Sequence, residues 1–85
     1  MDDDHKIIES PLSRRIAENG VTIDIQIYRG EQDAEWILEV VDSSGGSTVW
    51  QEPFETEEEA LSEVLRTIKT EGIRTFEKGP KDGAQ

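Results

Sequence analysis

The sequence predicts an α+β fold, in which an antiparallel β-meander of three or four strands is covered on one face by a single C-terminal α-helix. Three observations lead to this fold class. Apolar and polar residues alternate over residues 21–29 and again over 35–42, which is the period of a half-buried strand. Turn-forming segments separate the alternating stretches. Apolar residues then recur at helical spacing over 56–72, so one helix stripe can cover one sheet face.

Size and charge bound the remaining choices. The chain has 85 residues, with 9 Lys and Arg against 20 Asp and Glu, a net charge of −11. This length accommodates one small core. No apolar run approaches the roughly 18 residues of a membrane span, and no cysteine is present for disulfides or thiolate zinc sites. Because no apolar run is long enough, we expect no membrane partner, and because an anionic surface repels phosphate, we expect no nucleic-acid partner. No leader-like segment is recognised, so we expect a cytoplasmic protein.

Both ends of the chain are polar and lack periodicity. Residues 1–12 are acidic and are predicted to be a flexible N-terminal tail. Residues 77–85 contain two glycines and a proline among polar neighbours and are predicted to be a flexible C-terminal tail. A single α+β domain over residues 13–76 remains.

The turn sequence Asn19-Gly20 predicts a first hairpin that joins a strand over 14–18 to the strand over 21–29. An irregular lead-in or a short helix over 13–18 is the alternative for the first of these segments. The hairpin register pairs two apolar residues on the core face and two opposite charges on the outer face: Ile16 with Ile23, and Arg15 with Asp24.

A second hairpin is predicted with residues 30–33 as a four-residue loop. This register puts every apolar member on one face, and a shift by one residue would turn Trp36 away from the core. The same register sets Asp24 opposite Glu39 on the outer face. The predicted core pairs are Ile27 with Trp36, Ile25 with Leu38, and Ile23 with Val40.

A third turn over 42–47 leads into a strand over 48–51, which Pro53 ends because it cannot donate to a ladder. The direction of Trp50 depends on the turn. A turn of two or four residues points Trp50 outward beside Glu39, and a turn of odd length points it toward the core. The sequence leaves both open.

Both ends of the helix are marked in the sequence. Thr56 is the predicted N-cap, and Glu59 completes a capping box. Gly72 suits the position after the last turn, where Ile73 can touch Ile68. The apolar stripe between these ends consists of Ala60, Leu61, Val64, Leu65 and Ile68.

Residues that support catalysis are scarce. His5 is the one histidine, and it lies in the predicted tail beside an aspartate cluster over 2–4 that lacks fixed geometry for a metal ion. Asp24 and Glu39 form the one candidate carboxylate couple, but Arg15 would offset their repulsion. We therefore expect no enzyme activity, no cofactor and no metal site.

Charge is distributed unevenly along the chain. No Lys or Arg occurs from Glu31 to Glu63, a stretch with eleven acids. A solubility surface with capping acids is one interpretation, and a docking surface for a basic protein is the other. The eleven acids are Glu31, Asp33, Glu35, Glu39, Asp42, Glu52, Glu55, Glu57, Glu58, Glu59 and Glu63.

One sheet face has no helix left to cover it, and an apolar and aromatic patch rimmed by acids is typical of interaction sites. We therefore expect a non-catalytic protein-interaction or regulatory module with an unknown, basic protein partner, itself a monomer or weak homodimer. The predicted partner-binding face consists of Tyr28, Glu35, Ile37, Glu39, Val41 and Trp50.

The run from Glu35 to Ile73 resembles a group of small, functionally unassigned bacterial proteins. These share a W-x-L-E-V-V-D…S-T-V-W hairpin followed by an F-x-T-x-x-E-A-L helix start, here residues 36–42, 47–50 and 54–61. The likeness covers residues 21–73 and implies a fold but no activity. The helix start is also similar to that of antitoxins of the HicB type. Together with the acidic stretch it implies an alternative function, an antitoxin-like or nucleic-acid-mimicking inhibitor, although we recognise no counterpart of the DNA-binding segment such antitoxins usually carry.

Overall fold

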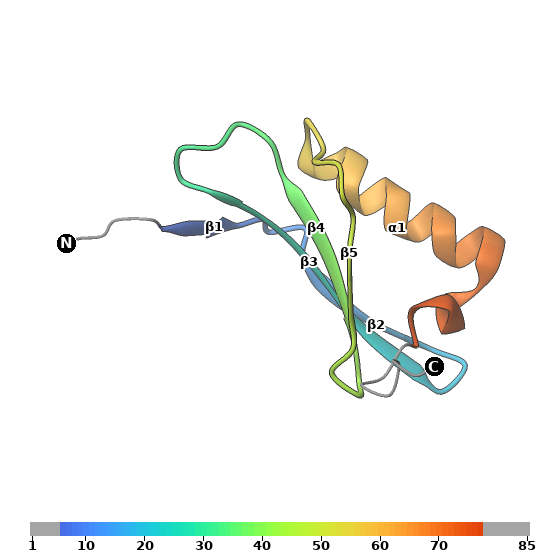
Figure 1. The fold of residues 1–85 in the computed structure, drawn as a ribbon. Helices are drawn as coiled ribbons and strands as arrows, with labels where there is room; N and C mark the ends of the chain where they lie inside the picture. Colours follow the sequence, from blue (N-terminus) through green and yellow to red (C-terminus); the bar gives the residue numbers. More distant parts are fainter. Residues whose placement is uncertain (1–5, 78–85) are drawn as a thin grey trace.

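The structure, a computed structural model, describes residues 6–77 (Figure 1). The predicted fold class is confirmed, because one antiparallel sheet is covered on one face by a C-terminal helix. Within the described residues the sheet has five strands, one more than the upper expectation. The elements are β1 (Ile7–Glu9), β2 (Arg14–Glu18), β3 (Val21–Gly30), β4 (Ile37–Asp42), β5 (Ser47–Val49), α1 (Glu57–Glu71) and a 3₁₀ helix (Ile73–Phe76).

The additional strand is β1, which lies within the predicted N-terminal tail. It pairs with the end of β3, and Ser10 after it is only 2% exposed. The Ser10 N–H donates to the Ile27 carbonyl at 2.8 Å. The flexible-tail prediction is therefore wrong for residues 7–10. Residues 1–5, which include His5 and the aspartate cluster, and residues 78–85 lie outside the described part of the chain.

The first hairpin has the predicted register. Asn19 and Gly20 both adopt positive φ, 54° and 79°, as a two-residue hairpin turn requires. Ile16 pairs with Ile23, and Arg15 pairs with Asp24. The Arg15 Nε–Asp24 Oδ1 distance is 2.7 Å.

The β3–β4 register differs from the predicted one by two residues. Ile27 pairs with Leu38 rather than Trp36, and Ile25 with Val40 rather than Leu38. Trp36 instead exchanges backbone hydrogen bonds of 2.7 and 2.8 Å with Phe54, so the loop is longer than predicted. A shift by two residues keeps every side chain on its predicted face, which is why alternation alone does not detect it.

The core lies between β3, β4 and α1, as the apolar stripes predict. Its buried members are Val21, Ile23, Ile25, Ile27, Leu38, Val40, Ala60, Val64, Ile73 and Phe76.

The helix ends are confirmed as well. Thr56 Oγ1 accepts from the Glu59 N–H at 3.1 Å, and Gly72, with φ at 88°, donates its N–H to the Ile68 carbonyl at 2.8 Å. The 3₁₀ helix that follows was not predicted. No helix among the described residues is long and apolar enough to cross a membrane.

Candidate functional site

The turn between β4 and β5 decides which way Trp50 points. The Asp42 N–H donates to the Gly46 carbonyl at 2.9 Å, which leaves three residues, 43–45, in the turn. Asp42 Oδ1 accepts from the Ser44 and Gly46 N–H groups, both at 2.9 Å. The odd alternative therefore holds: Val49 pairs with Glu39 and is 50% exposed, and Trp50 turns toward the helix. The assignment of Trp50 to the outer face is wrong.

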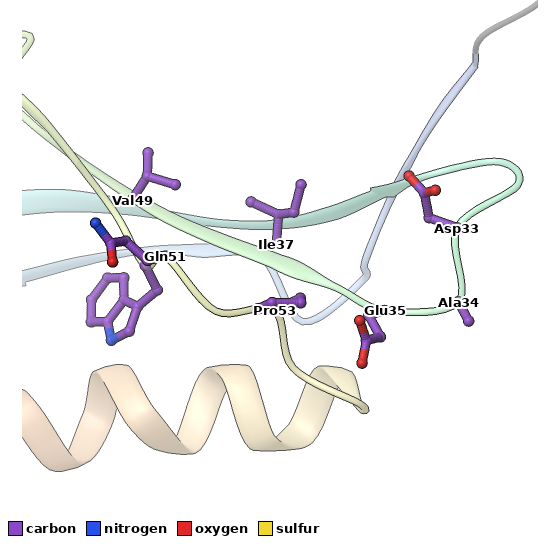
Figure 2. Close-up of a pocket in the computed structure, with 8 residues that line it drawn as sticks. Asp33, Ala34, Glu35, Ile37, Val49, Gln51 and Pro53 are labelled. Carbon is purple, nitrogen blue, oxygen red and sulfur yellow. The ribbon is translucent and has the colours of Figure 1, made fainter.

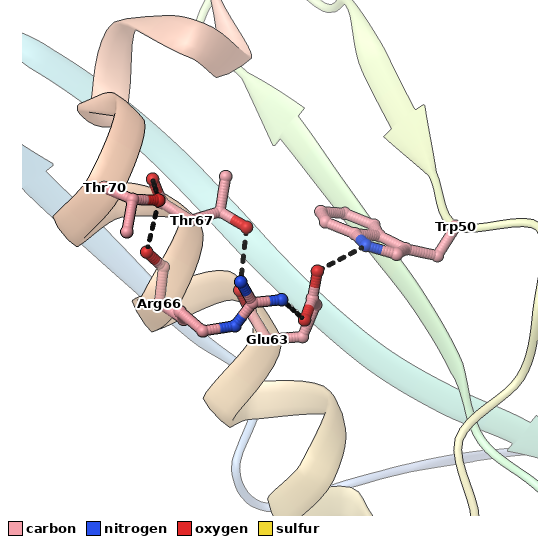
Figure 3. A network of polar contacts seen from close by, with 5 residues as sticks. All are labelled: Trp50, Glu63, Arg66, Thr67 and Thr70. Carbon is pink, nitrogen blue, oxygen red and sulfur yellow. Dashed lines mark hydrogen bonds and ion pairs between the residues drawn. The ribbon is translucent and has the colours of Figure 1, made fainter.

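Trp50 is half-buried between the sheet and α1. Its Nε1–H donates to Glu63 Oε2 at 3.3 Å (Figure 3). The centroid of its ring lies 5.9 Å from that of the Phe76 ring. Glu63 also pairs with Arg66 one helical turn on. Trp50 thus joins the edge of the sheet to the middle of the helix.

The sheet face opposite α1, here called the outer face, holds four of the predicted site residues. They are Tyr28, Ile37, Glu39 and Val41, all half-buried. Among the described residues no helix covers this face (Figure 1). The Tyr28 hydroxyl donates to Glu39 Oε1 at 2.9 Å. Burial raises the pKa of Tyr28, and the hydrogen bond to Glu39 and its negative charge raise it further.

The candidate carboxylate couple is not formed as predicted. Because of the register shift, Asp24 pairs with Val41, and Glu39 pairs with Gln26. Asp24 is held by Arg15 and Glu39 by Tyr28, so each carboxylate has its own partner. The predicted pairing of Asp24 with Glu39 is wrong.

A bulge after β5 opens a hollow at the edge of the sheet. The Trp50 N–H donates to the Leu38 carbonyl, and Phe54 exchanges backbone hydrogen bonds with Trp36. Between these two pairs, the three residues 51–53 lie opposite the single residue Ile37. The hollow next to this bulge, here called the edge hollow, has a volume of about 730 Å³. It is lined by Asp33, Ala34, Glu35, Ile37, Val49, Trp50, Gln51 and Pro53.

Apolar and acidic groups meet in the edge hollow. Ile37 and Val49 point away from α1, and Asp33 lies beyond Ile37 on the β3–β4 loop (Figure 2). Glu35 is exposed in the same loop. Three predicted site residues, Glu35, Ile37 and Trp50, line the hollow. The other five were missed: Asp33, Ala34, Val49, Gln51 and Pro53. Pro53 was interpreted only as the end of a strand, and the bulge it belongs to follows from the Trp36–Phe54 pairing, which no local pattern signals.

Most of the eleven acids of the central stretch belong to the β3–β4 loop, the segment that enters α1, or the first turn of the helix. The pairing of Trp36 with Phe54 brings the β3–β4 loop beside the segment that enters α1 (Figure 1). The nearby Arg29 lies over the Trp36 ring, 5.1 Å from its centroid, and donates to the Asp33 carbonyl at 2.7 Å. We call this region the acidic end; its carboxylates are Glu31, Asp33, Glu35, Glu52, Glu55, Glu58 and Glu59.

Within residues 6–77, no group of three or more His, Asp and Glu side chains is arranged to hold a metal ion. No protein-family model, curated protein or solved structure matches this chain. The edge hollow and its surroundings are therefore the features of the molecule that indicate a function.

Proposed function

We propose that this protein is a non-catalytic interaction module that docks a basic protein partner in the edge hollow and on the adjoining outer face. The observation that carries the proposal is the composition of the hollow, which is lined both by the apolar side chains of Ile37 and Val49 and by the acidic residues Asp33 and Glu35. Apolar contact provides affinity at an interface, and complementary charge provides specificity and a faster encounter. The proposal includes the cytoplasmic location expected from the sequence.

The charge of the chain favours a different protein over a second copy as the occupant. At a net charge of −11, two copies that face each other through this site bring like charges together. A partner rich in Lys or Arg is instead attracted electrostatically by the acidic end, so its association rate rises. This attraction weakens as salt screens the charges. Binding that falls with rising ionic strength is therefore expected.

Affinity capture from a lysate of the source organism tests the proposal with matched variants. Asp33→Lys/Glu35→Lys reverses two exposed charges at the hollow, and Glu18→Lys/Glu71→Lys makes the same charge change away from it. The proposal requires a protein that the wild type and the Glu18/Glu71 control retain at low salt and that the Asp33/Glu35 variant loses. Equal retention by all three proteins, or no retained protein at low or moderate salt, would contradict it.

The acidic end supports a second candidate, an inhibitor that presents carboxylates where a toxin or nuclease binds phosphates. Co-expression with a neighbouring toxin or nuclease should then restore growth. Under this candidate, Glu55→Gln/Glu58→Gln/Glu59→Gln abolishes the rescue, whereas Val49→Thr preserves it because apolar contact at the edge plays no part.

A further inference from the structure

The backbone of β5 has hydrogen-bonding groups on a side that no described strand occupies. The Trp50 N–H donates to the Leu38 carbonyl at 3.1 Å, and the Asp42 N–H donates to the Gly46 carbonyl at 2.9 Å. The backbone groups of Gly46 and Trp50 therefore face β4. Alternate residues of an antiparallel strand bond to the same neighbour, so the N–H and C=O groups of Ser47 and Val49 point away from β4. Within residues 6–77 the sheet order ends at β5, and this edge is unpaired.

The two sides of this edge differ in chemistry. On the outer face, a strand laid beside β5 would meet Val49 and, across the bulge, Ile37. On the helix side it would meet the rim of Trp50 and the first two turns of α1, beside a second hollow lined by Phe54, Glu58, Glu59, Ser62, Glu63 and Arg66. Arg66 is paired with Glu63, so the carboxylates of Glu58 and Glu59 give this side its negative charge. A segment that fits both sides therefore alternates apolar side chains with Lys or Arg.

We infer that the free edge of β5 receives a short extended segment of the basic partner as an additional antiparallel strand, with apolar side chains on the outer face and Lys or Arg on the helix side. This inference rests on the proposed function and specifies how the partner binds. Backbone hydrogen bonds supply the affinity in such strand addition, and alternate side chains supply the specificity. The shortness of β5 and the proline at position 53 confine the added strand to a few residues.

A synthetic heptapeptide of alternating Lys and Val, with blocked ends, is a suitable probe. Residues directly opposite each other in an antiparallel pair share a face, so the Val residues of the probe lie opposite Ser47 and Val49 and direct their amides at β5. N-methylation of the Val amides removes these donors. N-methylation of an equal number of Lys amides, which point away, gives a control peptide of identical composition.

Binding is followed by amide NMR of the full-length protein. The inference predicts shifts of the Ser47 and Val49 amides and slower exchange of both, together with about tenfold weaker binding of the Val-methylated peptide and a change of less than about threefold for the Lys-methylated one. Equal weakening of both peptides, no effect at these two amides, or no binding of the unmethylated probe would overturn it.

The protein side of the contact is tested with Val49. Val49→Pro removes the outward N–H and leaves the bonds of Thr48 and Trp50 to β4 in place, so about tenfold weaker probe binding is expected, whereas Val49→Thr retains the N–H. If Val49→Pro does not fold, the comparison of the two methylated peptides on the wild-type protein tests strand addition instead. If probe binding is unaffected by Val49→Pro and by the N-methylations but is lost in Asp33→Lys/Glu35→Lys, strand addition is wrong and the proposed docking function is still supported.

Discussion

The indole N–H of Trp50 donates to Glu63 Oε2 at 3.3 Å, and this bond joins the end of the edge strand to the middle of α1 (Figure 3). Because neighbouring residues of a strand point to opposite faces, the contact also leaves Val49 on the outer face, 50% exposed. Because Trp50 packs toward the helix and Val49 is exposed, substitutions at these two positions should differ in their effect on stability.

Trp50→Ala is expected to lower the free energy of unfolding by about 2–4 kcal/mol, because it empties the space beside Phe76 and removes the hydrogen bond to Glu63. Val49→Ala, on the exposed side, should cost less than about 0.5 kcal/mol. Urea unfolding followed by circular dichroism measures both changes. A larger loss for Val49→Ala than for Trp50→Ala would mean that the β4–β5 turn has an even number of residues after all.

The titration of Tyr28 should report its contact with Glu39. Tyr28 is the only tyrosine in the chain, so tyrosinate absorbance follows this residue alone. Its pKa is raised by burial first and then by Glu39, so the midpoint should lie above the ordinary value near 10. Glu39→Gln should lower the midpoint without restoring the ordinary value, since burial remains. Glu18→Gln, at the far end of the sheet, should leave it unchanged, and an equal effect of both variants would contradict the assignment.

The same contact makes the stability depend on pH at the alkaline end. The folded protein holds the Tyr28 proton more tightly than the unfolded chain, so the contribution to stability is complete below the ordinary pKa and disappears as pH rises through the raised pKa. Tyr28→Phe should therefore flatten the fall in unfolding free energy above about pH 10. An unchanged slope in this variant would show that other groups cause the fall.

The contact between Ser10 and Glu57 should stabilise the fold, although residue 10 lies in a segment that the sequence predicts as a tail. Ser10 is buried, donates to Glu57 Oε1, and accepts from the Leu12 N–H at 3.0 Å. Ser10→Ala should cost about 1–3 kcal/mol, since it removes the bond to Glu57 and leaves the half-buried Leu12 N–H without its acceptor. A double-mutant cycle with Glu57→Ala isolates the pair and should give a coupling of about 0.5–1.5 kcal/mol. A neutral Ser10→Ala would mean that the hydroxyl contacts of Ser10 with Glu57 and Leu12 add nothing to the stability of the fold.

The differences between sequence expectation and structure come from contacts between distant segments. The helix boundaries and the first hairpin could be predicted, because Thr56, Gly72 and Asn19-Gly20 act through local backbone geometry. The β3–β4 register could not, since alternation with a period of two is unchanged by a shift of two residues. That register depends on Trp36 pairing with Phe54, eighteen positions later in the chain.

Some features of the candidate site likewise follow from local sequence, and others depend on contacts between distant segments. The outer-face positions of Tyr28, Ile37, Glu39 and Val41 follow from alternation, which identifies a face correctly even in the wrong register. The direction of Trp50 depends on how Asp42 closes its turn, and the edge hollow depends on the bulge at 51–53. Neither feature has a local signal in the sequence. Ile7–Glu9 is too short to show alternation and becomes a strand because it completes the edge of β3.

The guanidinium of Arg29 should limit the mobility of the β3–β4 loop, which lines the edge hollow. It lies over Trp36 and donates through Nη1 to the carbonyls of Asp33 and Gly30, at 2.7 and 3.2 Å, so it ties the acidic loop to the sheet. Arg29→Lys keeps the charge but loses the planar group that stacks on the ring while it binds the carbonyls. The Asp33 and Trp36 amides should then exchange faster, with a loss of global stability of only about 0.5–1.5 kcal/mol.

Arg14→Lys is the matched control, because Arg14 also donates to one backbone carbonyl, that of Leu12 at 3.0 Å, but lies away from the loop. It should leave the exchange of Asp33 and Trp36 unchanged. If Arg29→Lys leaves these amides as protected as in the wild type, the loop is held by the Trp36–Phe54 pair alone. If it speeds their exchange, capture of the basic partner should weaken in parallel, because Asp33 and Glu35 no longer have a fixed position beside Ile37.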